Sequence, residues 1–453
     1  MNRFAKYLEE NGPRFEQELR DLLRIPSISA DPDRNGDMDR AAQWLADRFD
    51  RLGFRSEVIP TAAHRLVYAE SPKVEGAPTV LVYGHYDVQP VDPLELWTTP
   101  PFEPAVRDGN LFARGATDDK GQVLTHLFSA EAWLNVEGRL PVNLKYLIEG
   151  DEEVGSRGLH EYLAANPSRL ACDCVVISDG SQFGPGQPAI TYGLRGIACF
   201  ELILHGPNRD LHSGSFGGSI TNPVNALAKM LAALVDDHGR VQIPGFYDDV
   251  LPLSIEERRR LAQLPFDERR YFEQAGVTGA TGEEGYTALE RRWARPTFDL
   301  CGIYGGYSGK GAKTILPASA GAKLSFRLVP KQDPAKIAEA LRQMIEGLCP
   351  PGIRFELLDQ HGSPAVLVPP ESRWVQGAAR AIEQAFGTAP VLTREGGSIP
   401  IVLDFFNALG ADSLLIGWGL DDDNAHSPNE KFSLADFHRG IAASTLLWEE
   451  LAK

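Results

Sequence analysis

Acidic and imidazole side chains stand where hydrophobic runs of this chain end, and this placement most constrains how the chain can fold. An ionised group in an apolar environment is unstable unless it pairs with an opposite charge or binds a metal ion. The side chains concerned are His85, Asp118, Glu152, Glu153, Asp179 and His426. We therefore expect the fold to give these groups a shared partner.

Three of the hydrophobic runs have the length and composition of buried strands. They are Thr79–Gly84, Val142–Ile148 and Cys174–Ser178. His85 follows the first run, the Glu152–Glu153 pair lies just beyond the second, and Asp179 follows the third. In open α/β sheets functional groups gather at the carboxyl ends of strands. The sequence therefore predicts that these acids and this histidine meet at one edge of a sheet.

The remaining groups lie in turns and loops. Asp118 stands in the glycine-bounded turn Arg114–Gly121, before a helical pattern over 122–135, and His426 precedes a final helix. Asp87 lies two residues after His85, so in an extended chain both side chains point the same way. Its carboxylate is placed to accept a hydrogen bond from the ring nitrogen that does not bind metal.

Each motif alone also has an ordinary structural explanation. A single histidine near a strand is usually a core or surface residue, a Glu-Glu pair is usually a solvated loop, and Asp-Asp in a glycine-rich turn is usually turn chemistry. Four such motifs at strand ends in one chain favour a metal site.

The chain of 453 residues is too long for one ordinary core, so we expect two domains. Helical and strand patterns alternate from about residue 13 to 190, which predicts a largely parallel sheet with helices on its faces. The pattern then changes to strands at 197–204, near Thr314, at 323–329 and at 354–358, with helices opening at Pro223 and Pro334. This order is βαββαβ. Residues 245–300 interrupt it with a charged stretch that we interpret as mostly solvated helix.

Several ordered motifs resemble the carnosinase, aminoacylase and desuccinylase family of co-catalytic metallopeptidases. They are Gly84–Val88, Gly115–Gly121, Glu152–Ser156, Ser178–Asp179 and His426–Glu430. Further segments are similar to the carnosinase and cytosolic dipeptidase branch: Pro188–Gly196, Asp210–Gly214, Gly311–Thr314, Ser325–Pro330 and Thr393–Pro400. The resemblance covers almost the whole chain.

The resemblance implies an α/β fold whose zinc-peptidase-like catalytic domain, with a mixed, largely parallel sheet, is formed by residues 1–193 and 367–453. Residues 194–366 are then an inserted ferredoxin-like βαββαβ domain that serves as lid and dimerisation domain. It also implies a cis peptide bond between Asp118 and Asp119.

By the same resemblance, Asp118 bridges two divalent ions, His85 and Asp179 complete one site, and Glu153 and His426 complete the other. Glu152 is the carboxylate that remains as general base, and a pair of ions can hold and acidify a shared water. Nitrogen and oxygen ligands without thiolate suit zinc, manganese or cobalt alike, and zinc is the ion that we expect first.

The inserted domain is expected to recognise the substrate. Arg327 matches a carboxylate-binding arginine, whose guanidinium grips a carboxylate with two hydrogen bonds, and Thr314 and Ser398 are its expected helpers. His212 resembles a histidine that acts across the interface of a homodimer.

The predicted function is hydrolysis of dipeptides or short peptides with a free C-terminal carboxylate. An N-acyl-amino-acid deacylase or desuccinylase is the alternative. A di-metal phosphoesterase and a non-catalytic binding protein are more distant, and the presence of Glu152 argues against the latter.

Composition limits partners and compartment. Acidic residues number 62 and basic residues 45, and the formal net charge of −17 makes nucleic acid and anionic membranes improbable partners. Five scattered cysteines favour a reducing compartment, and we expect a cytoplasmic protein. We see no apolar signal region at the N-terminus and no run of about 18 apolar residues.

Overall fold

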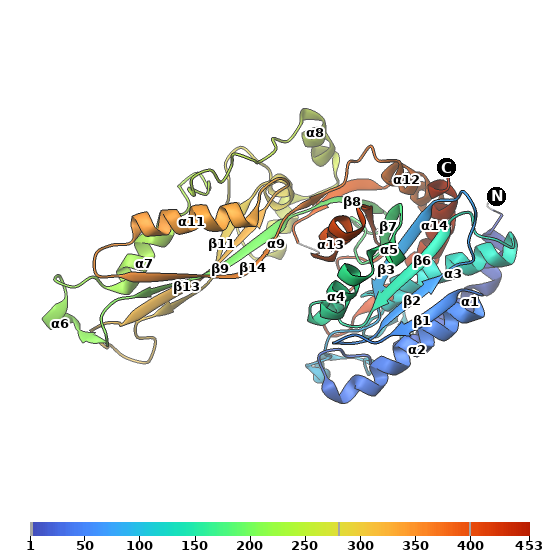
Figure 1. The fold of residues 1–453 in the computed structure, drawn as a ribbon, viewed down its shortest axis with the longest axis horizontal. Helices are drawn as coiled ribbons and strands as arrows, with labels where there is room; N and C mark the ends of the chain where they lie inside the picture. The colour runs from blue at the N-terminus through green and yellow to red at the C-terminus, as the bar shows by residue number, and fades with distance from the viewer. Residues whose placement is uncertain (1–2, 280, 398–399) are drawn as a thin grey trace. The chain divides into compact units, whose positions relative to one another are not determined.

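The computed structural model describes residues 3–279, 281–397 and 400–453 (Figure 1). The chain divides into two compact units. Unit 1 comprises Met1–Tyr192, Val368–Thr393 and Ile401–Lys453, and unit 2 comprises Gly193–Leu367 and Arg394–Pro400. The segment from Arg394 groups with unit 2, although the sequence assigned it to the catalytic domain. Its contacts give the reason: Arg394 pairs with Glu257, and Gly396 O accepts a hydrogen bond from Arg195 Nε.

Unit 1 is built on a mixed sheet in the order β1-β2-β6-β3-β7-β17-β8. The strands are β1 Arg55–Ile59, β2 Leu66–Glu70, β3 Thr79–His85, β6 Asn143–Glu149, β7 Cys174–Ile177, β8 Ala189–Leu194 and β17 Asp412–Ile416. The central strands β6, β3, β7 and β17 pair in parallel, and the flanking pairs are antiparallel. The sheet is therefore parallel at its centre, where the carboxyl ends of β6, β3 and β7 lie side by side.

Helices cover both faces of this sheet. The helices of unit 1 are α1 Ala5–Leu23, α2 Asn35–Arg51, α3 Lys120–Val136, α4 Arg157–Ala165, α5 Pro167–Leu170, α12 Arg373–Phe386, α13 Pro400–Leu409 and α14 Leu434–Leu451. Val80 and Val82 of β3 share one buried cluster with α1, α2, α3, α12 and α14. Tyr83, on the opposite face of β3, packs edge-on against Phe405 of α13. Because both faces are covered at the centre of the sheet, β3 and β7 are almost entirely apolar and buried, and this makes them recognisable in the sequence.

A small antiparallel sheet in unit 1 joins two distant parts of the chain. Its order is β18-β5-β4, with β4 at Ala105–Arg107, β5 at Asn110–Phe112 and β18 at Lys431–Ser433. It therefore holds the chain just before α3 against the chain just before α14.

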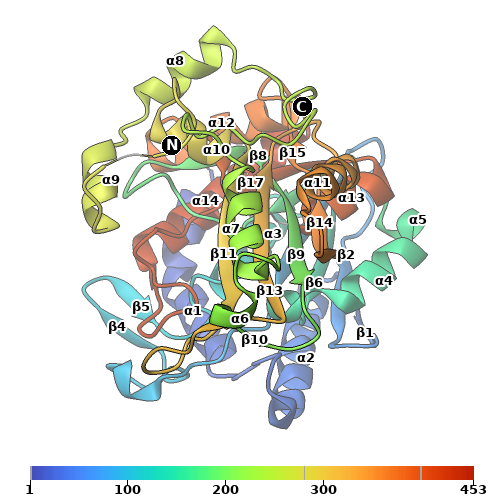
Figure 2. The same cartoon turned by 90° about the vertical axis from the view of Figure 1, so that its left-hand side faces the viewer.

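Unit 2 has a four-stranded antiparallel sheet in the order β11-β13-β9-β14 (Figure 2). The strands are β9 Gly196–His205, β11 Thr297–Gly305, β13 Ser319–Leu328 and β14 Arg354–Ser363. Helices α7 (Pro223–Ala232) and α11 (Pro334–Leu348) share its hydrophobic cluster. The chain order β9-α7-β11-β13-α11-β14 is the predicted βαββαβ arrangement.

The second strand of this motif differs from the prediction. The strand expected near Thr314 is the short β12 (Ile315–Leu316), which pairs with β10 (Leu211–His212) outside the main sheet. The second strand of the motif in the main sheet is instead β11, which lies at the end of the charged stretch. Three helices precede it in that stretch: α8 Ile255–Gln263, α9 Glu268–Gln274 and α10 Ala288–Trp293. Ile303 and Tyr304 of β11 are 62% and 43% exposed, so this edge strand lacks the alternation of a half-buried strand.

Among the described residues, no helix is both long enough and apolar enough to cross a membrane.

Candidate metal centre

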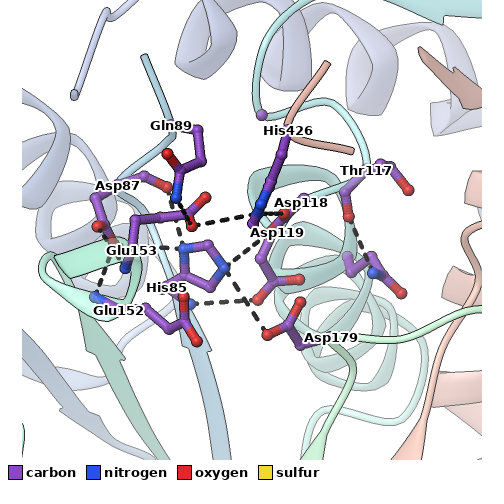
Figure 3. A network of polar contacts seen from close by, with 12 residues as sticks. His85, Asp87, Gln89, Thr117, Asp118, Asp119, Glu152, Glu153, Asp179 and His426 are labelled. Carbon is purple, nitrogen blue, oxygen red and sulfur yellow. Dashed lines mark hydrogen bonds and ion pairs between the residues drawn. The ribbon is translucent and has the colours of Figure 1, made fainter. Parts of the chain in front are cut away.

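The centre of the site is His85, the last residue of β3 and fully buried. β3 lies between β6 and β7, so the loops that leave these neighbours deliver Glu152, Glu153 and Asp179 beside it. The structure thus gathers at one sheet edge the groups that the strand pattern predicted there (Figure 3).

Asp118 stands between the two histidines, with one oxygen toward each. His85 Nε2 lies 3.0 Å from Asp118 Oδ1 and 3.9 Å from Asp179 Oδ2. His426 Nε2 lies 2.8 Å from Asp118 Oδ2 and 3.2 Å from Glu153 Oε2. Two groups of potential ligands result, and they share Asp118: His85, Asp118 and Asp179 in one, Asp118, Glu153 and His426 in the other.

Asp87 links the histidine to the turn that carries both glutamates. His85 Nδ1 lies 3.1 Å from the Asp87 carbonyl oxygen and 3.3 Å from its Oδ1. The Asp87 carboxylate also accepts hydrogen bonds from the backbone N–H of Glu152 (3.3 Å) and of Glu153 (3.1 Å). This buried carboxylate therefore fixes the ring of His85 and the Glu152–Glu153 turn together, as supporting groups around a metal do.

The turn that carries Asp118 approaches β3 closely. The Asp118–Asp119 peptide bond is cis, and Asp119 Oδ2 accepts a hydrogen bond from the His85 backbone N–H at 3.2 Å. A Cβ atom at Gly84 would lie 2.6 Å from Asp119 Oδ2. Glycine before His85 is thus what allows the turn to reach the strand end.

The electrostatics of the site show an excess of carboxylates. Hydrogen bonds with Asp118 and Glu153 raise the pKa of His426 to about 10. Burial alone would lower the pKa of His85, but its hydrogen bonds with Asp118 and Asp87 outweigh burial and raise that pKa well above the usual value. Burial and the charge of Asp118 raise the pKa of Asp179 to about 7. The neighbouring carboxylates therefore favour the protonated form of both histidines.

This donor set fits divalent metal ions. Imidazole nitrogens and carboxylate oxygens converge, and a divalent ion in each ligand group would replace the protons and relieve the repulsion among the carboxylates. Glu152 belongs to neither ligand group found among the described residues. Burial, followed by the charges of Glu153 and Asp118, raises its pKa, although His85 opposes the shift.

Gln89 is a site residue that sequence reasoning missed. Its Nε2 donates a hydrogen bond to Glu153 Oε2 at 2.7 Å, the oxygen that also faces His426. A glutamine four residues after a strand end has no distinguishing pattern in the sequence, so only the three-dimensional contact reveals it.

Three of the expected substrate-binding residues, His212, Thr314 and Arg327, belong to unit 2. His212 and Thr314 are exposed neighbours: Ser213 N donates to Thr314 O at 3.0 Å. His212 Nδ1 accepts a hydrogen bond from Gly214 N at 3.1 Å, which leaves Nε2 to carry the proton of the neutral ring. Arg327 lies half-buried on β13, opposite Thr297 of β11. Ser398 lies outside the described residues.

Comparison with known proteins identifies the family. The model of peptidase family M20/M25/M40 matches residues 81–450. A Cys-Gly metallodipeptidase of Candida albicans is 36% identical over 455 residues, which cover 96% of this chain and 93% of the relative. The Beta-Ala-His dipeptidase of Homo sapiens is 31% identical over 480 residues, 100% of this chain and 93% of the relative.

Solved structures agree with this. A metallo-carboxypeptidase from Sulfolobus solfataricus is 35% identical and superposes with a TM-score of 0.83 over 97% of this chain and 99% of its own. The chain belongs to peptidase family M20/M25/M40 and is a metallopeptidase. The predicted family and fold class are confirmed.

Loading of metal should displace protons. With the pKa of His426 at about 10, its ring is protonated at pH 7 and must lose that proton before Nε2 can bind an ion. We expect release of about one proton or more per ion bound, and an affinity that falls as the pH is lowered. Calorimetric titration with metal in buffers of different ionisation enthalpy measures the release. Heats that do not depend on the buffer would contradict the assignment of His426 as a ligand.

Proposed function

We propose that this metallopeptidase hydrolyses the peptide bond of dipeptides and short peptides with a free C-terminal carboxylate. The observation that carries the proposal is the sharing of Asp118 between two ligand groups, with the unassigned carboxylate of Glu152 beside them. Two dipeptidases among the relatives align with almost the whole length of this chain. Their names give Cys-Gly and beta-Ala-His as the dipeptides on which those relatives act.

In this proposal Asp118 would be a ligand common to two divalent ions. His85 and Asp179 bind one ion, Glu153 and His426 bind the other, and zinc is the first expectation, with manganese or cobalt as alternatives. Such ions, when bound, lower the pKa of a shared water and polarise the scissile carbonyl. Asp87 keeps His85 oriented, and Gln89 restrains Glu153.

Glu152 is the proposed general base. It takes a proton from the attacking water and later delivers it to the leaving amine. Its raised pKa supports this role because a carboxylate of raised pKa accepts a proton more readily. Its backbone N–H is fixed by Asp87, so the base and the Glu153 ligand are held by the same carboxylate.

We further propose that Arg327 binds the C-terminal carboxylate of the substrate, with Thr314 and Ser398 as helpers, and that His212 stabilises the oxyanion in the active site of a partner subunit. The exposed position of His212 supports action on another chain. The edge strand β11, with Leu300, Ile303 and Tyr304 at its surface, supports association of two copies.

The proposed activity is tested with a substrate panel. Metal-loaded protein is incubated with dipeptides, longer peptides, N-acyl amino acids and a phosphodiester, before and after chelation. We expect cleavage of dipeptides with a free carboxylate, much weaker cleavage of C-terminally amidated ones, and loss of activity on chelation that zinc, manganese or cobalt restores. Preference for N-acyl amino acids would favour a deacylase, and activity in metal-free protein would contradict the mechanism.

The variants Glu152→Gln and Glu153→Gln complete this test. The first keeps the shape of the side chain and removes the proton acceptor, so kcat on the preferred dipeptide should fall by about 10²–10⁴-fold while metal content stays near wild type. The second removes a ligand and should lose one ion. The opposite pattern would mean that base and ligand are exchanged.

The role of His212 across the interface is tested by mixing two inactive chains. In a mixed dimer of His212→Ala with Glu152→Gln, one site combines an intact Glu152 from the first chain with an intact His212 from the second. Random exchange makes about half of the dimers mixed, so roughly a quarter of all sites should regain activity. If activity does not return although subunit exchange is demonstrated, His212 acts in the active site of its own chain or has only a structural role.

A further inference from the structure

Glu430 is a fully buried carboxylate that belongs to neither ligand group, although it stands four residues after His426. Both of its oxygens are occupied by N–H donors from one short segment. Oε2 accepts from Arg114 Nη1 at 2.8 Å and from Gly115 N at 2.9 Å. Oε1 accepts from Thr117 N at 3.0 Å and from Asp118 N at 3.2 Å.

These donors form the turn that presents Asp118 to the histidines. The turn leads from β5 into α3, and it wraps around the Glu430 carboxylate while the Glu430 backbone oxygen accepts from Ala113 N at 3.1 Å. Immediately afterwards β18 pairs with β5, with Lys431 opposite Phe112. One residue thus clamps the Asp118 turn through both its side chain and its backbone.

The other side of the His426 loop is tied to the same turn. Asp423 is buried, and its Oδ2 accepts from Thr117 Oγ1 at 3.1 Å and from Leu420 N at 2.8 Å. Its Oδ1 lies 2.8 Å from Lys431 Nζ. The loop that carries His426 is therefore held at both ends against the Asp118 turn.

The ligand groups differ in how their members are supported. His85 is the last residue of β3, and Asp179 lies two residues beyond the end of the paired strand β7, so the sheet restrains the position of both. His426 stands on a loop with a positive φ of 60° and a side chain that is 55% exposed. Its place beside Asp118 depends on the contacts of the loop.

We propose that Glu430 is a positioning residue for the ligand group Asp118, Glu153 and His426. Its carboxylate binds the turn of Asp118 while its backbone continues the loop of His426, and so it sets the separation of these two ligands before an ion arrives. Ligands that are held in place lose less conformational freedom on binding, and loss of such support typically weakens metal affinity 10–100-fold. The inference rests on the proposed two-ion site.

The test is stepwise metal affinity in Glu430→Gln, measured by calorimetric titration of the metal-free protein with Zn²⁺ or Mn²⁺. The amide replaces one acceptor oxygen by an NH₂ group that faces N–H donors, so the clamp is disrupted at nearly constant volume. We expect the ion at Asp118, Glu153 and His426 to bind about 10–100-fold more weakly. The ion at His85, Asp118 and Asp179 should lose less affinity, because the sheet still holds His85 although Asp118 belongs to both groups. Excess metal should then restore most of kcat.

Glu131→Gln is the matched control. Glu131 is also a buried carboxylate, on α3, and it pairs with Arg14 and Arg48 but contacts no member of the ligand groups. Its loss should lower the midpoint of thermal unfolding and leave both metal affinities at wild-type values. Glu430→Asp keeps the charge and shortens the side chain, so it should lower the affinity for the ion at Asp118, Glu153 and His426 to an intermediate degree. If Glu430→Gln does not fold, the affinities of Glu430→Asp provide the test.

Wild-type affinities for both ions in the Glu430 variants, with lowered thermal stability like that of Glu131→Gln, would overturn the proposal and leave Glu430 a structural residue. An equal loss of affinity for both ions would contradict the proposal that Glu430 acts mainly on one ligand group. A wild-type protein that binds fewer than two ions would contradict the proposed function itself, and this outcome is visible before any variant is compared.

Discussion

The carboxylate of Asp118, shared between two histidines, is the interaction on which the rest of the site depends. Each oxygen faces a different imidazole, at 3.0 Å and 2.8 Å. The surrounding carboxylates raise the pKa of both rings, and burial together with the charge of Asp118 raises the pKa of Asp179 to about 7. Divalent ions satisfy the same groups with less repulsion, so the arrangement is best explained as a binding site built for them.

Two kinds of support hold these ligands. The parallel centre of the sheet fixes His85, the glutamate turn and Asp179, because neighbouring strands end at the same edge. Asp118 and His426 come from outside the sheet, and buried carboxylates place them: Asp119 joins its turn to β3, and Glu430 joins it to the His426 loop. The rigid sheet and the clamped loops together give preorganised geometry, which catalysis by bound ions requires.

Much of this was predictable because buried strands are apolar on both faces. The run Thr79–Gly84 became β3, and the expected partners at its end are close together in space. The edge strand β11 was missed because its exposed apolar residues show no alternation. The contacts of Gln89 and Glu430 could not be predicted from the sequence, because residues as far apart in the chain as Glu430 and Asp118 come together only in the tertiary fold. The roles of Arg327 and His212 rest on the resemblance and remain predictions.

The central claim is that one carboxylate bridges two ions in a site formed by the fold. The most direct measurement is anomalous X-ray scattering from crystals of the manganese-loaded protein, which locates each ion without reference to activity. The account predicts two peaks about 3.5–4 Å apart, one on each side of the Asp118 carboxylate. A single peak, or peaks that do not contact Asp118, would contradict it.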